Sequence, residues 1–440
     1  MSKSRVSRAN QTASWLLVLF LIGSSLALGG NRPQFWLLNF GVLSLVTALY
    51  LFLVTNSRSH LVGVEHSNRA IIYLTLAYPV LVLALTLTHW FSSTNPSLLT
   101  PAFGLIRVFS YILFAWLAFQ ALRNERRALT AARLTVIGLS ILAFYGLIST
   151  DNPNLLFYKK ISYDGFATGP FVNRNSFATL LAMGATLSLA LAITPQNQST
   201  RRSRTQSNPL KIDRVIGQAL AFSPVLLFLS CALLTGSRMG LFVTFLGMGL
   251  VVLLGGQLSS VSRKKVMALA VLLATILIVA FTLSFGQLTF DRLGSTGASA
   301  DVRGNLYITI INMIKEAPII GHGFDSFTQS YRLFHTAPVS ADLRWDQAHN
   351  TYLELWAELG LLVGSIPPLI CLLAGVNLYR RAIVPKSKAA PLACAGFASI
   401  FACAIHSLVD FSLEMPTNVY LLIFITAMGL APQAKSRIGA

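Results

Sequence analysis

The sequence predicts an all-α polytopic membrane protein, because it is strongly hydrophobic, poor in charge and built of long apolar runs. Of its 440 residues, 54% are hydrophobic and only 11% are charged, and the mean hydropathy is +0.64. A soluble domain carries about 25% charged residues. Barrel strands would give short alternating segments of about ten residues, whereas these runs are continuous. The runs therefore predict helices that cross a bilayer.

Twelve apolar runs predict about twelve transmembrane helices. Their expected positions are 14–29, 35–54, 70–91, 101–121, 134–149, 175–194, 215–235, 239–256, 266–285, 349–377, 390–411 and 417–431. One long polar interval separates the ninth run from the tenth. It divides the chain into a bundle of helices one to nine at 1–285, a long outer loop at 286–348, and helices ten to twelve at 349–440.

Basic residues gather in alternate loops and predict the orientation of the chain. If the amino terminus is cytoplasmic, the cytoplasmic segments hold 23 of the 34 Lys and Arg residues but only three of the 15 acidic residues. This asymmetry follows the positive-inside rule and puts both termini in the cytoplasm. The net charge of +19 therefore reflects topology rather than nucleic-acid binding. Lipid head-group binding is the alternative for the basic runs 123–127 and 201–204.

The first span also fits a second interpretation, a cleaved signal peptide. Lys3, Arg5 and Arg8 precede its apolar run, and residues 25–27 resemble a cleavage site. Either interpretation leaves the orientation of the later spans unchanged.

The interval 286–348 is the longest polar stretch between spans, and a loop of this length is usually functional. Ser299 or Asp301 can cap a helix whose apolar residues share one stripe. A second short helix fits residues 324–334, and a third begins near Ala341. We expect these amphipathic helices to lie on the outer surface of the bilayer.

Among the arginines outside the predicted cytoplasmic segments, where orientation does not explain them, three are candidates for a site: Arg174, Arg238 and Arg303. An arginine near the membrane needs an anionic partner. A phosphate is one candidate, because its oxygens match the planar guanidinium group. The alternatives are an internal pair with Asp410 or Glu414 for Arg238, a solvated ion pair for Arg303 and a lipid head-group contact for Arg174.

His349 lies at the mouth of the tenth span and is the candidate general base. A histidine can remove a proton near neutral pH, which suits the activation of a sugar hydroxyl. Its expected supporting residues are Tyr307, Asn350 and Glu354. The alternative is an interfacial histidine that only forms hydrogen bonds. Glu354 and Glu358 need partners near the membrane, and they either orient His349 or bind arginines.

No motif predicts a cofactor or a metal ion. The sequence contains no phosphate-binding GxxxxGK[ST] loop. Its outer acids do not form a ligand-spaced set. The four cysteines all fall within apolar runs, so we expect no disulfide framework. His406 and Asp410 are one helical turn apart, and we interpret them as a buried polar pair.

Together these segments resemble the O-antigen ligase and O-antigen polymerase superfamily of bacterial membrane glycosyltransferases. The resemblance covers residues from about 169 to 415. The most specific matches are Arg303 with residues 314–323, and residues 349–353 with 358–360. Residues 236–238 and 173–178 match less specifically but in the right order.

The resemblance implies a metal-independent, inverting glycosyltransferase without a cofactor, on the periplasmic face of the bacterial inner membrane. Its donor would be a glycan on undecaprenyl pyrophosphate, with Arg238 and Arg303 holding the pyrophosphate and His349 activating the acceptor hydroxyl. Arg174 is the candidate third contact.

The first functional hypothesis is an O-antigen ligase-like enzyme of lipopolysaccharide biosynthesis, which transfers the glycan to lipid A–core. The alternative is an O-antigen or exopolysaccharide polymerase, which joins lipid-linked repeat units. A third hypothesis, from another class, is a lipid-linked oligosaccharide flippase, which would show internal repeats and charges in the middle of its spans.

Overall fold

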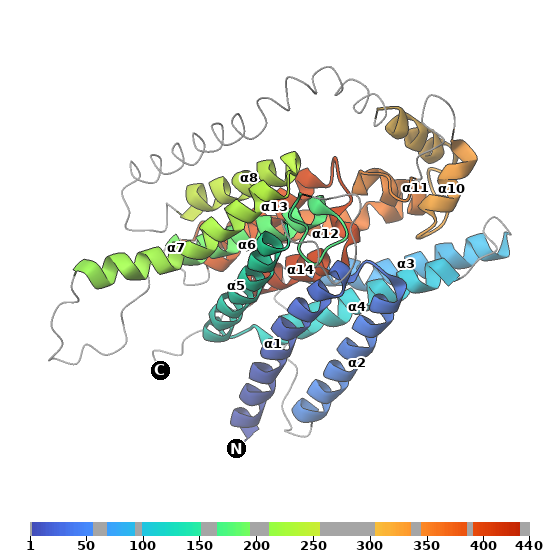
Figure 1. Cartoon of the computed structure of the whole chain (residues 1–440). Helices are drawn as coiled ribbons and strands as arrows, with labels where there is room; N and C mark the ends of the chain where they lie inside the picture. The colour runs from blue at the N-terminus through green and yellow to red at the C-terminus, as the bar shows by residue number, and fades with distance from the viewer. Residues whose placement is uncertain are drawn as a thin grey trace, which may run out of the picture.

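The structure is a computed structural model that describes eight stretches of the chain. These are residues 2–55, 68–92, 99–150, 165–193, 211–255, 304–335, 345–384 and 390–431. All regular elements in these stretches are helices, so the protein is an all-α polytopic membrane protein, as the sequence predicts. Figure 1 shows how the helices pack around α6 and α13.

The first eight predicted spans each correspond to one helix. These are α1 (Ser2–Leu26), α2 (Pro33–Thr55), α3 (Arg69–Phe91), α4 (Leu99–Ala121), α5 (Glu125–Ile148), α6 (Arg174–Ile193), α7 (Lys211–Leu234) and α8 (Arg238–Gly255). The ninth predicted span, 266–285, lies outside the described residues. A short 3-10 turn, η1 (Leu28–Gly30), joins α1 to α2.

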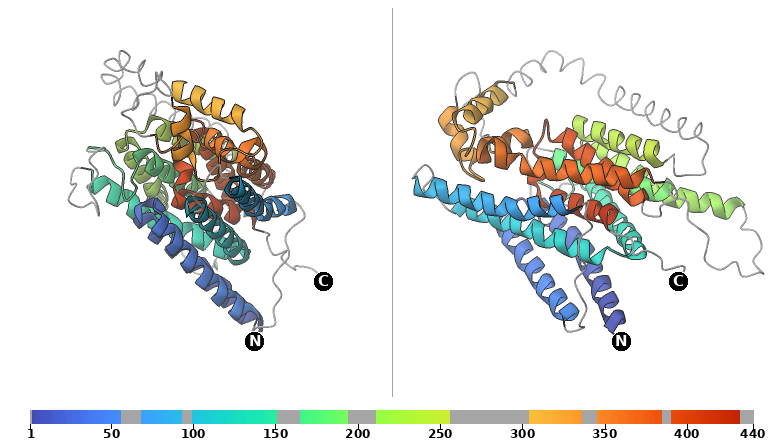
Figure 2. Two further views of the ribbon diagram at one scale, coloured as in Figure 1. Left: turned by 90° about the vertical axis from the view of Figure 1, so that its right-hand side faces the viewer. Right: turned by 180° about the vertical axis from the view of Figure 1, so that it is seen from behind.

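The later part of the chain contains shorter helices. Residues 304–316 are helical, and they are followed by α10 (Phe327–Phe334), α11 (Thr351–Gly364), α12 (Ile366–Ala382), α13 (Ala390–His406), η5 (Ser412–Glu414) and α14 (Pro416–Leu430). Helices at 304–316 and in α10 agree with the expectation of short helices in the long loop. In both Figure 1 and Figure 2, α10 lies beside α11 and near the end of α3.

The predicted number of spans is approximate. Among the described residues, eight helices are long and apolar enough to cross a membrane, or nine if α11 and α12 together form one span. Helices α13 and α14 are apolar but have only 17 and 15 residues. A bilayer accommodates short apolar helices of this kind by becoming thinner around them.

The tenth predicted span, 349–377, is broken rather than continuous. Helices α11 and α12 meet at an angle of 70°. Within α11, Gly360 has a φ of 71°, which is outside helical geometry. A Cβ atom at Gly360 would overlap the Ile319 carbonyl, so glycine is required where the outer loop contacts this helix. Pro367 and Pro368 then begin α12, where proline is well tolerated.

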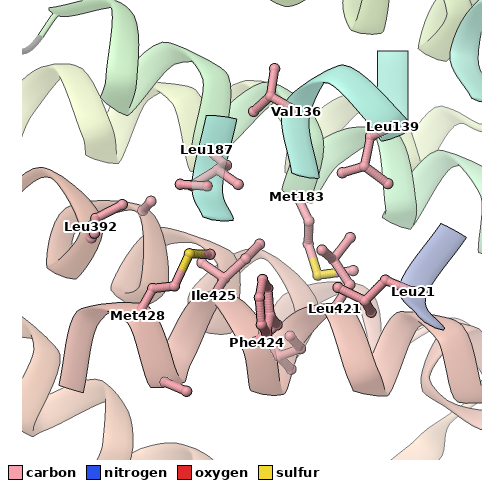
Figure 3. Close-up of a cluster of buried hydrophobic side chains, with 14 of the residues drawn as sticks. Leu21, Val136, Leu139, Met183, Leu187, Leu392, Leu421, Phe424, Ile425 and Met428 are labelled. Atoms are coloured by element: carbon pink, nitrogen blue, oxygen red, sulfur yellow. The ribbon is translucent and has the colours of Figure 1, made fainter. Parts of the chain in front are cut away.

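The main hydrophobic core lies where α1, α5, α6, α13 and α14 meet. Figure 3 shows Leu21, Leu139, Met183 and Phe424 converging there from four of these helices. Helix α6 is buried along most of its length, from Ser176 to Ala190. Because α6 is central, its first residues are held firmly in place, and this matters for the site described below.

Turns predicted to lie on the outer side contact one another at one end of the bundle. The Ser24 and Thr417 hydroxyls are 2.9 Å apart, which joins the end of α1 to the start of α14. His89 Nε2, near the end of α3, lies 3.2 Å from the Ile320 carbonyl oxygen of the outer loop. These contacts join segments that the charge pattern predicts to lie on the same side of the membrane, and the orientation itself stays a prediction.

Candidate functional site

Two of the three predicted arginines begin neighbouring helices. Arg174 is the first residue of α6 and Arg238 is the first residue of α8, and these helices pack side by side. The Arg174 guanidinium lies over the Phe166 ring, 4.3 Å from its centroid. Gly236 has a φ of 60°, and a Cβ atom there would lie 3.0 Å from Arg174 Nη1. The fold therefore brings the two basic segments together.

The positions of these arginines favour an anion between the two helix starts. The amino end of a helix carries partial positive charge and unpaired N–H groups, so a cation there does not stabilise the helix. Local caps are already present: Asn173 Oδ1 accepts a hydrogen bond from Asn175 N at 2.7 Å, and Ser237 Oγ accepts one from Gly240 N at 3.2 Å. Arg174 and Arg238 add positive charge at the amino ends of α6 and α8, and positive charge at a helix amino end suits a phosphate.

His349 has an unusual backbone conformation that the surrounding structure holds in place. Its φ is 52°, in the left-handed region that costs a non-glycine residue about 1–3 kcal/mol. The Tyr307 hydroxyl donates a hydrogen bond to the His349 carbonyl oxygen at 2.9 Å. Glu354 Oε2 accepts a hydrogen bond from Ala348 N at 3.0 Å. Two of the three predicted supporting residues, Tyr307 and Glu354, thus bind the backbone of His349 and of the residue before it.

Asn350, the third predicted supporting residue, caps α11. Its Oδ1 accepts hydrogen bonds from Tyr352 N at 3.0 Å and Leu353 N at 3.1 Å. Its Nδ2 donates to the Leu408 carbonyl oxygen at 2.9 Å. The start of α11 is therefore attached to residues 407–415, which we call the α13–α14 turn. The contacts of the three supporting residues hold the backbone around His349 in place.

The His349 ring packs between two aromatic side chains. Its centroid is 4.8 Å from that of Phe411 and 5.8 Å from that of Trp345, and both contacts are edge-on. Phe411 belongs to the α13–α14 turn. The ring orientation is therefore set by packing against this turn and against the end of the outer loop.

The α13–α14 turn also contacts the start of α6, beside Arg174. Asp410 Oδ1 accepts a hydrogen bond from Asn175 Nδ2 at 3.0 Å, and Asp410 Oδ2 accepts one from Ser412 Oγ. On the other side, Thr351 Oγ1 donates to the Asp410 carbonyl oxygen at 3.2 Å. One short turn thus connects the arginine-bearing helix starts to the histidine-bearing start of α11.

His406 and Asp410 are both buried, as the sequence interpretation of a buried polar pair requires. Each also binds α6. His406 Nδ1 is 2.7 Å from the Thr179 hydroxyl, and Asp410 binds Asn175 as described. These two residues therefore anchor the end of α13 and the turn that follows it to the central helix.

Arg303, the third predicted arginine, lies outside the described residues. The helix that follows it does form, at residues 304–316. Leu306, Ile310 and Met313 on this helix are buried against Phe327 in a small core of the outer loop. Of the predicted stripe, Leu306, Ile310 and Ile314 are buried in this core, whereas Ile311 is exposed. The role of Arg303 stays a prediction.

Glu358, whose partner the sequence did not identify, binds backbone amides of the outer loop. Its Oε1 accepts from Phe327 N at 2.8 Å, and its Oε2 accepts from Asp325 N at 3.0 Å. A carboxylate at the start of α10 also interacts favourably with the helix dipole. Glu354 and Glu358 therefore attach the loop to α11 by accepting hydrogen bonds from its backbone amides.

Sequence reasoning did not identify Arg107, which is buried on α4. Its Nη1 lies 2.9 Å from Glu414 Oε2, and its Nη2 lies 3.4 Å from Asp325 Oδ1. Its guanidinium also lies 4.6 Å from the centroid of the Trp36 ring. The available signal was a charged residue inside the fourth apolar run, which requires a partner. Glu414, considered above for Arg238, pairs with Arg107.

Within the described stretches, no group of three or more His, Cys, Asp and Glu side chains could hold a metal ion. The described cysteines are all free thiols. The apolar helices of spanning length indicate a multi-pass membrane protein.

Comparison with known proteins agrees with the predicted resemblance. Residues 223–366, about a third of the chain, match the family model described as O-antigen ligase. No curated protein matches the chain. The match supports the predicted similarity of this region to the O-antigen ligase superfamily. The matched region contains Arg238, Arg303 and His349, whereas Arg174 precedes it.

Proposed function

We propose that the protein is an O-antigen ligase-like glycosyltransferase. It transfers a glycan from undecaprenyl pyrophosphate to a hydroxyl of lipid A–core on the periplasmic face of the bacterial inner membrane. The observation that carries this proposal is that the α6 start, which lies beside the α8 start, and His349 both contact the α13–α14 turn. An anion-binding region and a base close to each other are what such a transfer needs.

Arg174 and Arg238 hold the donor pyrophosphate, together with Arg303. As the bond between the sugar and the pyrophosphate breaks, negative charge grows on the leaving oxygen. Guanidinium groups and helix amino ends stabilise that charge without having to reorient during the reaction. They supply the positive charge that a divalent ion provides in other phosphate-leaving reactions, which is why we propose a metal-independent enzyme.

His349 activates the acceptor. Its imidazole takes the proton of the acceptor hydroxyl while that oxygen forms a bond to the anomeric carbon. The pyrophosphate leaves from the opposite side with the bonding electron pair, so the anomeric configuration inverts. The edge-on contacts of the ring with Trp345 and Phe411 keep it from rotating away, which preserves the alignment of the reacting atoms.

The decisive variant is His349→Asn. Asparagine adopts a left-handed backbone conformation more readily than most residues, so the variant removes the base while preserving the φ of 52°. We expect glycan transfer by the purified protein to fall about 10²- to 10⁴-fold, the usual contribution of a general base. The elution volume and the melting temperature should not change.

The control is His335→Asn, which alters a histidine of the same outer loop whose ring packs against Tyr331. It should retain transfer. The assay offers an undecaprenyl-pyrophosphate glycan with lipid A–core or with a second lipid-linked unit, in separate reactions. Near-normal turnover by His349→Asn contradicts the assigned base. Transfer to the lipid-linked unit alone indicates a polymerase instead of a ligase.

A further inference from the structure

The end of α3 and the outer loop together expose four large apolar side chains. Phe91 is 79% exposed and Ile319 is 67% exposed, and Trp90 and Ile320 are exposed as well. The contact of His89 Nε2 with the Ile320 carbonyl oxygen holds the two segments next to each other, as the right-hand view of Figure 2 shows. We call these four exposed residues the α3–loop patch. Large apolar side chains that gather on a surface mark contact with a protein or a membrane.

The two isoleucines of the patch belong to a turn whose backbone is bonded to α11. The Pro318 carbonyl oxygen accepts a hydrogen bond from Leu361 N at 2.8 Å, and His322 N donates to the Ala357 carbonyl oxygen at 2.9 Å. These two bonds lie on either side of the bend at Gly360. The backbone of the turn is therefore fixed on α11, while its isoleucine side chains remain exposed.

On α3 the patch continues a stripe of exposed apolar residues. The stripe consists of Tyr73, Leu76, Val80, Leu83 and Leu87. Their spacing of three and four residues puts them on one face of the helix, and Trp90 is the next residue at this spacing. The buried residues of α3 lie on a different face: Pro79, Val82, Thr86 and His89. Because α3 is long and apolar enough to cross a membrane, its exposed stripe faces lipid, and Trp90 lies where the stripe ends.

The composition of the patch and the stripe favours lipid over a second protein. Tryptophan is enriched where the hydrocarbon of a bilayer meets water, because its ring is apolar and its N–H group is polar. The α3 stripe consists of large side chains, whereas helices that associate within membranes use small residues that let their backbones approach. Lys315 and Glu316, which precede the turn, are exposed charges and suit the aqueous side of this boundary.

We propose that the α3–loop patch inserts into the bilayer at the boundary between head groups and hydrocarbon, on the predicted outer side. Ile319 and Ile320 then anchor the outer loop in the membrane between the spans that flank it. Because their turn is bonded to both sides of the Gly360 bend, insertion sets the depth of α11, which begins just after His349. That this depth brings His349 to lipid-linked substrates rests on the proposed function, whereas the insertion itself does not.

Nitroxide accessibility of the full-length protein in nanodiscs tests the proposal. A spin label is attached to Ile319→Cys in a protein whose native cysteines are replaced by alanine. Oxygen concentrates in the bilayer and a nickel chelate stays in water, so the ratio of the two accessibilities rises with depth. Interfacial side chains lie about 5–10 Å into the boundary, so we expect the ratio to be about threefold higher at Ile319→Cys than in water.

Two further labelled positions provide the scale for this measurement. Arg332→Cys labels an exposed, charged position on α10 of the same loop and should give the ratio of a site in water. Leu87→Cys labels the α3 stripe one turn before Trp90 and should give a higher ratio than Ile319→Cys. If the cysteine-free protein does not elute as a folded protein, only the half-buried Cys371 is replaced, because the other three native cysteines are buried.

Equal ratios at Ile319→Cys and Arg332→Cys overturn the proposal. Low accessibility of Ile319→Cys to both reagents means that protein covers the patch, for example a second copy of the chain, and overturns it as well. The measurement requires no turnover. A protein that gives the expected ratios but transfers no glycan contradicts the proposed function alone, whereas normal transfer with a water-exposed label at Ile319→Cys contradicts the insertion alone.

Discussion

Arg107 and the Arg174–Arg238 pair both lie near the α13–α14 turn, but they occupy different positions in their helices: Arg107 lies within α4, whereas Arg174 and Arg238 begin α6 and α8. Arg107 is surrounded by acids and forms salt bridges with Asp325 and Glu414. Arg174 and Arg238 begin helices, where the backbone itself contributes positive charge. Arg107 therefore has acidic partners within the fold, whereas for Arg174 and Arg238 we propose a negatively charged ligand. Position along the chain would not have distinguished them.

Arg238→Gln tests the ligand side of this comparison and has the largest expected effect. Removing one partner from a desolvated charged contact costs about 2–5 kcal/mol, so we expect donor-dependent transfer to fall by about two orders of magnitude or more. Folding should be unaffected. The measurement combines initial transfer rates with melting temperature. Arg332→Gln, an exposed arginine on α10, is the control and should behave like wild type. Loss of stability without a specific loss of transfer would make Arg238 structural too.

Arg107→Gln tests whether Arg107 stabilises the folded protein. The change leaves Asp325 and Glu414 without their cation, and breaking a buried pair in this way costs about 3 kcal/mol or more. We expect a clear drop in melting temperature, measured by thiol-reactive dye unfolding in detergent. Arg69→Gln changes an exposed arginine at the start of α3 and should shift stability by less than about 0.5 kcal/mol. Equal melting temperatures of Arg107→Gln and Arg69→Gln would show that Arg107 does not stabilise the fold.

Gly360→Ala tests whether the outer loop must dock on the bend of α11. Alanine at a φ of 71° is strained, and its Cβ would overlap the Ile319 carbonyl. We expect a loss of about 2 kcal/mol and faster proteolysis within residues 304–335. Gly249→Ala is the control, because a Cβ there meets nothing within 4 Å and alanine favours the helix. Unchanged proteolysis in Gly360→Ala would mean that the loop docks without this contact.

Asp325→Asn should have the smallest effect on stability. It tests how much the charge of one acidic partner of Arg107 contributes to folding. Burial raises the pKa of Asp325, although Arg107 opposes this shift and Glu414 adds to it. Because the folded-state pKa is raised, the carboxyl favours folding at low pH and loses that contribution as the pH rises from its ordinary value of 3.8 through the raised value. The variant should therefore cost less than about 1 kcal/mol.

Melting temperatures of Asp325→Asn and wild type across pH 4 to 8 check this sign. The wild type should lose stability relative to the variant as the pH rises. The opposite trend would mean that the salt bridge with Arg107 outweighs the cost of burial.

The sequence was sufficient to predict what depends on composition and local pattern. Continuous apolar runs determine where helices cross a bilayer, and eight of the predicted spans each match one described helix. The apolar stripe after Arg303 predicted the helix at 304–316, because residues three and four apart share a face. The family match likewise agrees with motifs that can be read from single segments.

Only the tertiary structure decided which distant segments meet. The salt bridge of Arg107 with Glu414 joins residues 307 positions apart, and the hydrogen bond of Asn175 with Asp410 joins residues 235 positions apart. The bend at Gly360 exists because the outer loop packs against it, and a helical pattern alone would continue through that residue. Hydropathy and helical periodicity are properties of neighbouring residues, whereas partners for buried charges are supplied by packing, and no local pattern contains them.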